Sequence, residues 1–235
     1  NLHKKVVFVV EYLWLSQNDT PILQQAGPLF RSAALLFHPF VQMPNNWATN
    51  KRQHALEHVY PCTQEHLTLA TPIRWQDMLK KTGLVSYEQL AVSLLTSISS
   101  LNEVTANEQW ARQLNEALNE DLFYPTEDTI SVFLFEPIIA LFQQIGSTHI
   151  HYSNPILGVN GAIELTSATP ERLAEVTRNV CLFTDELERL VFISSFDTFV
   201  TVLLSKEEQI ELLIGERFEY LDCDETTSMS WWFRD

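Results

Sequence analysis

The stretch LFTDELERLVFISSFDTFVTVLLS, residues 182–205, decides the fold class. With the preceding Val-Cys it contains three apolar runs rich in β-branched and aromatic residues, at 180–184, 190–195 and 199–204. Short polar segments with Asp and Ser separate the runs, which is the pattern of strands joined by tight turns. The stretch therefore predicts three neighbouring strands of an antiparallel sheet.

The rest of the chain predicts helices around these strands. Ser86 and the capping-box spacing of Thr105 and Glu108 mark two helix starts, and Gly83 marks a helix end. Helices are predicted at 45–60, 73–81, 86–101, 105–120, 130–145, 170–176 and 206–214. Further strands are predicted at 6–15, at 149–153 and in the tail 228–233, with a hairpin turn at Asn160-Gly161.

This order of elements predicts an α+β fold. A helical first half is expected to pack on a mainly antiparallel sheet that the second half largely contributes. The chain has 235 residues, 46% of them hydrophobic, which suits a single domain, 1–235, with a substantial core. A soft boundary near 122–128 separates the helix-rich half from the strand-rich half.

Charge is distributed unevenly along the chain, whose formal net charge is −15. Residues 1–81 hold eight Lys or Arg against five Asp or Glu, which leaves seven against twenty-five for residues 82–235. An acidic surface repels phosphate backbones and argues against nucleic-acid binding. It favours a basic partner or a cation, although an acidic surface also serves solubility alone.

Cysteine usage and the N-terminal segment predict a cytoplasmic protein. Cys62, Cys181 and Cys223 lie far apart with no C-x-x-C, which indicates reduced thiols. The start HKKVVFVVEYLWL imitates a signal peptide, but Glu11 interrupts its apolar run and a buried strand fits it better. No stretch has the length of a membrane span, so no membrane partner is expected.

The segment His54-Ala-Leu-Glu57-His58 has the H-x-x-E-H pattern of one class of zinc peptidases. On a helix, two histidines four residues apart reach one metal ion, and Glu57 can act as general base on bound water. A third ligand is then needed, and Glu136 is the candidate that we name, with Glu127 also in range. The alternative is a solvated or partner-facing pair, because His54 and His58 lie opposite the apolar face of the predicted helix.

Other patterns of catalysis or metal binding are weaker or missing. His149 and His151 face the same side of a predicted strand, as a metal pair or simply as a polar face. No G-x-S-x-G, G-x-x-x-x-G-K-[ST] or G-x-G-x-x-G occurs, which argues against serine hydrolases, P-loop proteins and dinucleotide enzymes. No cofactor other than this zinc ion is expected.

Four segments together resemble a family of Bacillus and its relatives that is known only as a domain of unknown function. They are HPFVQMPNNW (38–47), KRQHALEHVYP (51–61), FYPTEDTISVFLF (123–135) and the stretch 182–205. The resemblance implies a bacterial, cytoplasmic protein and carries over no catalytic residue. Residues 182–213 are also similar to the closing segments of small bacterial immunity and antitoxin-like proteins, which neutralise a partner by surface complementarity.

Three hypotheses of function follow. The preferred one is a non-catalytic binding protein with an acidic surface and a basic protein partner. The alternative is a metal-dependent hydrolase built on His54, Glu57, His58 and Glu136. A third is a small-molecule pocket between the helical half and the sheet, lined by Trp47, Trp75 or Trp110. The sequence leaves the oligomeric state open.

Overall fold

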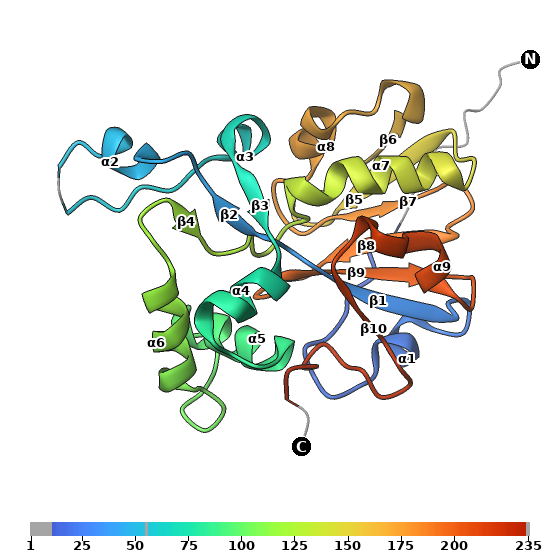
Figure 1. The fold of residues 1–235 in the computed structure, drawn as a ribbon. Coiled ribbons are helices and arrows are strands. Elements are labelled where there is room, and N and C mark those ends of the chain that lie inside the picture. The colour runs from blue at the N-terminus through green and yellow to red at the C-terminus, as the bar shows by residue number, and fades with distance from the viewer. Residues whose placement is uncertain (1–10, 55, 234–235) are drawn as a thin grey trace, which may run out of the picture.

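The computed structural model describes residues 11–54 and 56–233 and has a large sheet with helices on both faces (Figure 1). This seven-stranded sheet has the order β10-β1-β9-β8-β7-β5-β6, and its neighbouring strands pair antiparallel. The strands are β1 Ser32–Phe37, β5 His149–Asn154, β6 Val159–Glu164, β7 Leu182–Thr184, β8 Leu190–Ser194, β9 Val200–Ser205 and β10 Tyr220–Asp222. The predicted α+β class is confirmed, because all of these strands except β1 come from the second half.

The central strands are buried on both faces, which is why they are continuously apolar. Along β8, Val191 and Ile193 join the core on one face, while Leu190 and Phe192 join the core on the other. A strand with only one buried face would instead alternate apolar and polar residues. The large sheet is therefore the middle layer of three.

The two halves of the chain cover opposite faces of this sheet. Helices of the first half pack on one face: α1 Ile22–Ala26, α4 Trp75–Thr82, α5 Tyr87–Ser97 and α6 Glu108–Ala117. Helices of the second half pack on the other: α7 Phe135–Gln144, α8 Pro170–Val176 and α9 Ile210–Ile214. The predicted helical layer from the first half is present, but it supplies only one of the two outer layers (Figure 1).

Pro39 divides the apolar run 32–42 between two sheets. Before it lies β1, and after it lies β2 Phe40–Gln42, the middle strand of a three-stranded sheet with β3 Thr71–Ile73 and β4 Leu122–Phe123. Proline has no N–H to donate to a ladder, so a strand bends away or ends there. The short helices α2 Trp47–Lys51 and α3 Thr63–Leu69 lie beside this small sheet (Figure 1).

Several predicted helix ends are confirmed at the atomic level. The Ser86 side chain accepts the N–H of Gln89 at the start of α5, at 3.3 Å. Gly83 follows α4 in the left-handed conformation, with φ 74°. The start of α6 was predicted wrongly, because the capping side chain is Asn107, which accepts the N–H of Trp110 at 3.0 Å.

The predicted turn at Asn160-Gly161 is wrong. Both residues lie inside β6, and the β5–β6 hairpin instead turns through residues 155–158, where Gly158 has φ 63°. Gly161 pairs with Tyr152 across the hairpin, and a Cβ on Gly161 would lie 2.4 Å from the Tyr152 hydroxyl oxygen. The glycine leaves room for the tyrosine ring over its backbone.

The two predicted terminal strands are not found. Residues 6–10 lie outside the described residues, and residues 11–15 form no strand. The tail 228–233 consists mainly of turns, with a single bridge between Pro21 and Ser228. Trp231 of the tail is nevertheless buried against the ring of Phe37, at 5.5 Å between centroids, so its apolar character serves packing rather than pairing.

The β7–β8 turn offers a stability prediction, because Glu188 is held there in the left-handed region with φ 52°. Glu188→Gly is expected to raise the free energy of unfolding by about 1 kcal/mol, since glycine takes this conformation without steric cost. Urea unfolding measures the change. The neighbouring Leu187→Gly is the control: outside the left-handed region, glycine is expected to cost about 0.5–1 kcal/mol. Equal effects of the two substitutions would contradict the assignment of strain to Glu188.

Candidate functional site

The H-x-x-E-H segment does not lie on a helix. Helix α2 ends at Lys51, and His54 and His58 follow in turns and loop, so the predicted helix 45–60 is wrong beyond residue 51. The Glu57 carboxylate accepts the N–H of Gln53 and closes a turn within this loop. Leu56 is 87% exposed, so the segment has no buried apolar face to stabilise a helix in water.

The structure provides no ligand set for zinc at this segment. Glu136 lies exposed in the first turn of α7 and lines a different hollow, with Pro137 and Pro170. Among residues 11–54 and 56–233, no three His, Cys, Asp or Glu side chains gather as metal ligands, the His149 and His151 pair included. The zinc-hydrolase hypothesis therefore lacks the convergence of His54, His58 and Glu136 that it requires.

His58 instead lines a pocket of about 650 Å³, which we call the aromatic pocket. It lies between the loop 58–61, helix α6, strand β4 with the following loop, and the start of β9. Its aromatic walls and polar groups come from nine side chains: His58, Tyr60, His66, Asn115, Phe123, Tyr124, Thr126, Glu127 and Phe199. A cavity of this size and composition suits a small ligand.

The mouth and walls of the aromatic pocket are rigid ring systems. Tyr60 is 72% exposed, and its ring centroid lies 6.3 Å from that of Phe123. The His66 ring stacks on Phe133, with 6.2 Å between centroids, and burial lowers the pKa of His66 although Glu65 opposes this. The Tyr124 hydroxyl donates to the side-chain oxygen of Asn115 on α6. Exposed aromatic rings around a hollow are typical of ligand sites.

One carboxylate, that of Glu127, is among the described residues that line the aromatic pocket. Glu127 lies at its rim, and partial burial together with repulsion from Asp128 and Asp197 raises the pKa of this carboxyl. Asp128 is fixed next to it, because its carboxylate accepts the N–H of Asp197 at 2.7 Å. No Lys or Arg is among the described residues that line the pocket. A cation entering it would relieve the repulsion between carboxylates.

A buried histidine holds the wall of the aromatic pocket in place. His38 is fully buried; its Nδ1 bonds to the Thr126 carbonyl at 2.6 Å, and its Nε2 to the Thr201 hydroxyl at 2.8 Å. Burial lowers the pKa of His38 to about 4, so the ring is neutral at pH 7. A neutral ring donates from Nδ1 to the carbonyl and accepts at Nε2 from the hydroxyl. His38 thereby ties the loop that carries Glu127 to strand β9.

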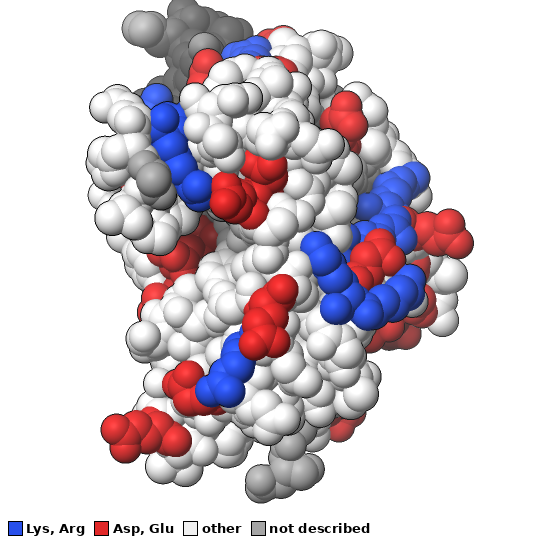
Figure 2. All heavy atoms as spheres, turned by 60° about the vertical axis from the view of Figure 1, so that its left-hand side comes forward, with Lys and Arg blue, Asp and Glu red and all other residues white. Residues whose placement is uncertain are grey.

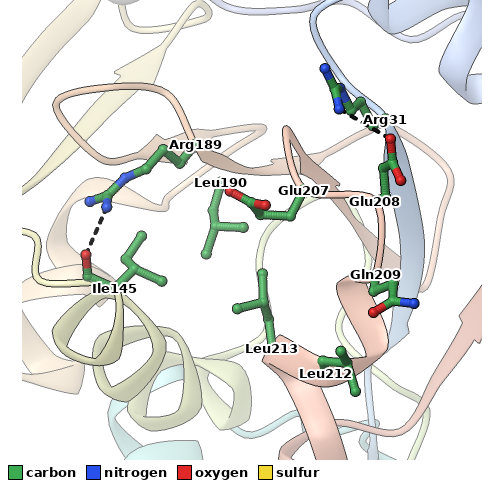
Figure 3. A pocket seen from close by; sticks show the side chains of 9 residues that line it. All are labelled: Arg31, Ile145, Arg189, Leu190, Glu207, Glu208, Gln209, Leu212 and Leu213. Carbon is green, nitrogen blue, oxygen red and sulfur yellow. Dashed lines mark hydrogen bonds and ion pairs between the residues drawn. The ribbon is translucent and has the colours of Figure 1, made fainter.

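A second hollow, of about 740 Å³, lies where α7 ends and α9 begins (Figure 3). Its arginines are engaged within the protein: Arg189 donates to the Ile145 carbonyl at 2.8 Å, and Arg31 pairs with Glu208 at 3.1 Å. In Figure 3 the Arg189 side chain reaches along the edge of the hollow towards α7, while Glu207 lies nearer its middle. These contacts give Arg189 a structural role. We therefore regard the aromatic pocket as the better candidate for a binding site.

The predicted tryptophan lining is absent from the aromatic pocket. Trp75 is buried and stacks on Phe37 at 4.5 Å between centroids, while its Nε1–H donates to the His38 carbonyl. Trp47 packs edge-on against Phe123, and Trp110 packs against the core under α6. Trp75 does line a hollow between α5 and the sheet, together with Trp231 and Trp232, but its volume of about 10 Å³ leaves no room for a ligand.

Comparison with known proteins places the chain in a family. The model of the family described as "Protein of unknown function (DUF2711)" matches residues 18–233, almost the whole described chain. The chain belongs to this family. The resemblance predicted from the sequence is thus confirmed. The matched region, residues 18–233, contains every residue of the aromatic pocket named above.

The chain is similar over nearly its whole length to a bacterial protein. The chain is 35% identical over 225 residues to the uncharacterized protein YwbB of Bacillus subtilis strain 168, covering 95% of this chain and 100% of the relative. No solved structure matches the chain significantly. Within the described part of this DUF2711 chain, no helix combines the length and the apolar character that crossing a bilayer requires.

Proposed function

We propose that this protein is a non-catalytic binding protein whose partner is a basic protein. The observation that carries the proposal is the aromatic pocket, which combines exposed rings and the Glu127 carboxylate with no Lys or Arg in its described lining. Residues 82–235 contain twenty-five Asp and Glu against seven Lys and Arg, which also supports a positively charged partner. Opposite charge speeds encounter and fixes orientation.

The chemistry of the aromatic pocket supports binding rather than catalysis. The aliphatic hydroxyl in its described lining is that of Thr126, whose Oγ1 has no hydrogen-bond partner and therefore no base that activates it. The buried Cys181 lies elsewhere, in the sheet, where burial raises the pKa of its thiol to about 12. Glu127 is exposed at the rim, and its charged neighbours are two further carboxylates, Asp128 and Asp197.

The charge distribution around α2, α3 and α6 bears on how such a partner would be recognised. In Figure 2, Lys and Arg side chains and Asp and Glu side chains lie interspersed over this face, with wide uncharged areas between them. A broad acidic patch does not dominate this view. Recognition of a basic partner on this side therefore depends on local features such as the aromatic pocket, with long-range attraction as a second contribution.

A pair of matched peptides tests the proposal. A fluorescein-labelled peptide of about ten lysines is expected to bind the protein, with a Kd that rises several-fold when about 0.2 M NaCl is added. Fluorescence anisotropy measures both values. A labelled peptide of the same length made of glutamate is the control and is expected not to bind. Equal binding of the two peptides, or binding that ignores salt, would overturn the proposal.

A further inference from the structure

The aromatic pocket has the features of a cation site. Tyr60 and Phe123 approach to 6.3 Å between ring centroids at its mouth, and Tyr124 forms part of the wall. The face of an aromatic ring carries negative potential and attracts ammonium and guanidinium groups within about 6 Å. The cavity volume of about 650 Å³ admits such a group together with several attached carbons.

The charges around the aromatic pocket select the same class of ligand. Glu127 is the carboxylate in its described lining, and Asp128 and Asp197 lie close enough to repel it. Lys51, which contacts the loop that carries Tyr60, is engaged: its Nζ lies 2.6 Å from the Glu65 carboxylate and 3.3 Å from the Tyr60 carbonyl. An anionic ligand would find no counter-charge in the described lining, whereas a cation would find one at the rim.

We infer that the aromatic pocket binds an alkylammonium or alkylguanidinium group, with Glu127 as its counter-ion and Tyr60 and Phe123 as its aromatic walls. The inference rests on the proposed binding of a basic partner and names the group that this partner inserts. The same chemistry is presented by the Lys and Arg side chains of a protein and by free organic amines. Tyr60 and Glu127 are both mainly exposed, so substitutions there leave the core unchanged.

Butylguanidinium and its neutral isostere butylurea form the first test. Butylguanidinium is expected to bind with a Kd of about 1 mM, and butylurea at least about tenfold more weakly, as measured by isothermal titration calorimetry. Glu127→Gln and Tyr60→Ala are each expected to weaken butylguanidinium binding about tenfold. The control is Glu116→Gln, which removes an exposed carboxylate of α6 outside the pocket lining and is expected to change nothing.

The results separate this inference from the proposed function. If the lysine peptide binds but Glu127→Gln and Tyr60→Ala bind it as tightly as Glu116→Gln does, the inference is wrong and the proposed function stands. If butylguanidinium binds as inferred but the peptide does not, the cation site stands and a basic protein partner is wrong. Competition between the two for wild-type protein would show that peptide side chains use the pocket. Equal affinity for butylurea would overturn the inference.

Discussion

Replacement of Asp185 by alanine is expected to lower the free energy of unfolding by about 3–5 kcal/mol. The Asp185 carboxylate is fully buried in the β7–β8 turn and accepts the backbone N–H groups of Leu187, Arg189 and Leu190. It also accepts the Arg189 Nε–H at 2.7 Å, and Arg189 in turn donates to the Ile145 carbonyl at the end of α7. Alanine would leave three amides and the Arg189 Nε–H without this acceptor.

Urea unfolding monitored by circular dichroism measures this loss. Asp77→Ala is the matched control, because Asp77 is an exposed carboxylate in an ion pair with Lys80, and it is expected to cost less than about 1 kcal/mol. Asp185→Asn keeps one acceptor oxygen and is expected to fall between wild type and Asp185→Ala, which covers the case of an alanine variant that does not fold. An Asp185→Ala midpoint equal to that of Asp77→Ala would refute the role of this turn.

Acidification is expected to destabilise the protein through His38 by about 3 kcal/mol. Burial lowers the folded-state pKa of His38 from 6.5 to about 4. Below pH 6.5 the unfolded chain binds a proton on this ring, whereas the folded protein does so only near pH 4. The stability that His38 contributes is therefore complete above pH 6.5 and lost as the pH falls to 4, at about 1.4 kcal/mol per pH unit.

Unfolding free energies between pH 7 and pH 4 test the role of His38. His38→Gln, whose amide can still bond to the Thr126 carbonyl, is expected to show a shallower decline than wild type. The exposed His54 is the control site, and His54→Gln is expected to leave the wild-type decline unchanged. NMR titration of the wild-type ring gives an independent readout. Protonation of His38 near pH 6.5 in the folded protein would contradict the prediction.

Local patterns were sufficient to predict many of the elements. The stretch 182–205 predicted β7, β8 and β9, because each apolar run has strand length and is bounded by turn residues. Ser86 and Gly83 predicted helix ends, because capping chemistry depends only on neighbouring residues. Pro170 at the first position of α8 is a signal of the same local kind.

Elements that depend on distant contacts could not be predicted in the same way. The segment 52–60 has helix-compatible residues, but Leu56 is 87% exposed, and the helix ends at Lys51. Asn160-Gly161 has the composition of a turn. The glycine is instead needed because a side chain at residue 161 would clash with the ring of Tyr152 on the neighbouring strand. The composition of the segment 52–60 does not show that Leu56 stays exposed, and the pair Asn160-Gly161 does not show which residue of the paired strand faces it.

The candidate site was predicted only in fragments. The sequence makes His58 a candidate metal ligand or part of a solvated pair, and Glu127 a possible third ligand, but it connects neither with an aromatic pocket. Tyr60, Tyr124 and Phe199 were not identified, because the pocket is assembled from segments separated by up to about 140 residues. The run Phe123-Tyr124-Pro125, followed by acidic residues, was the one local signal of an aromatic and negative surface.

The position of β1 has a consequence for how the chain acquires its structure during synthesis. β1 lies between β9 and β10, so residues 32–37 meet their partners only when residues 200–205 and 220–222 have left the ribosome. Until then Leu35 and Leu36 have no neighbouring strand with which to pair, so the sheet cannot form around β1 before the second half has been synthesised. Such distant pairing slows folding and lengthens the time during which these apolar residues are exposed to aggregation.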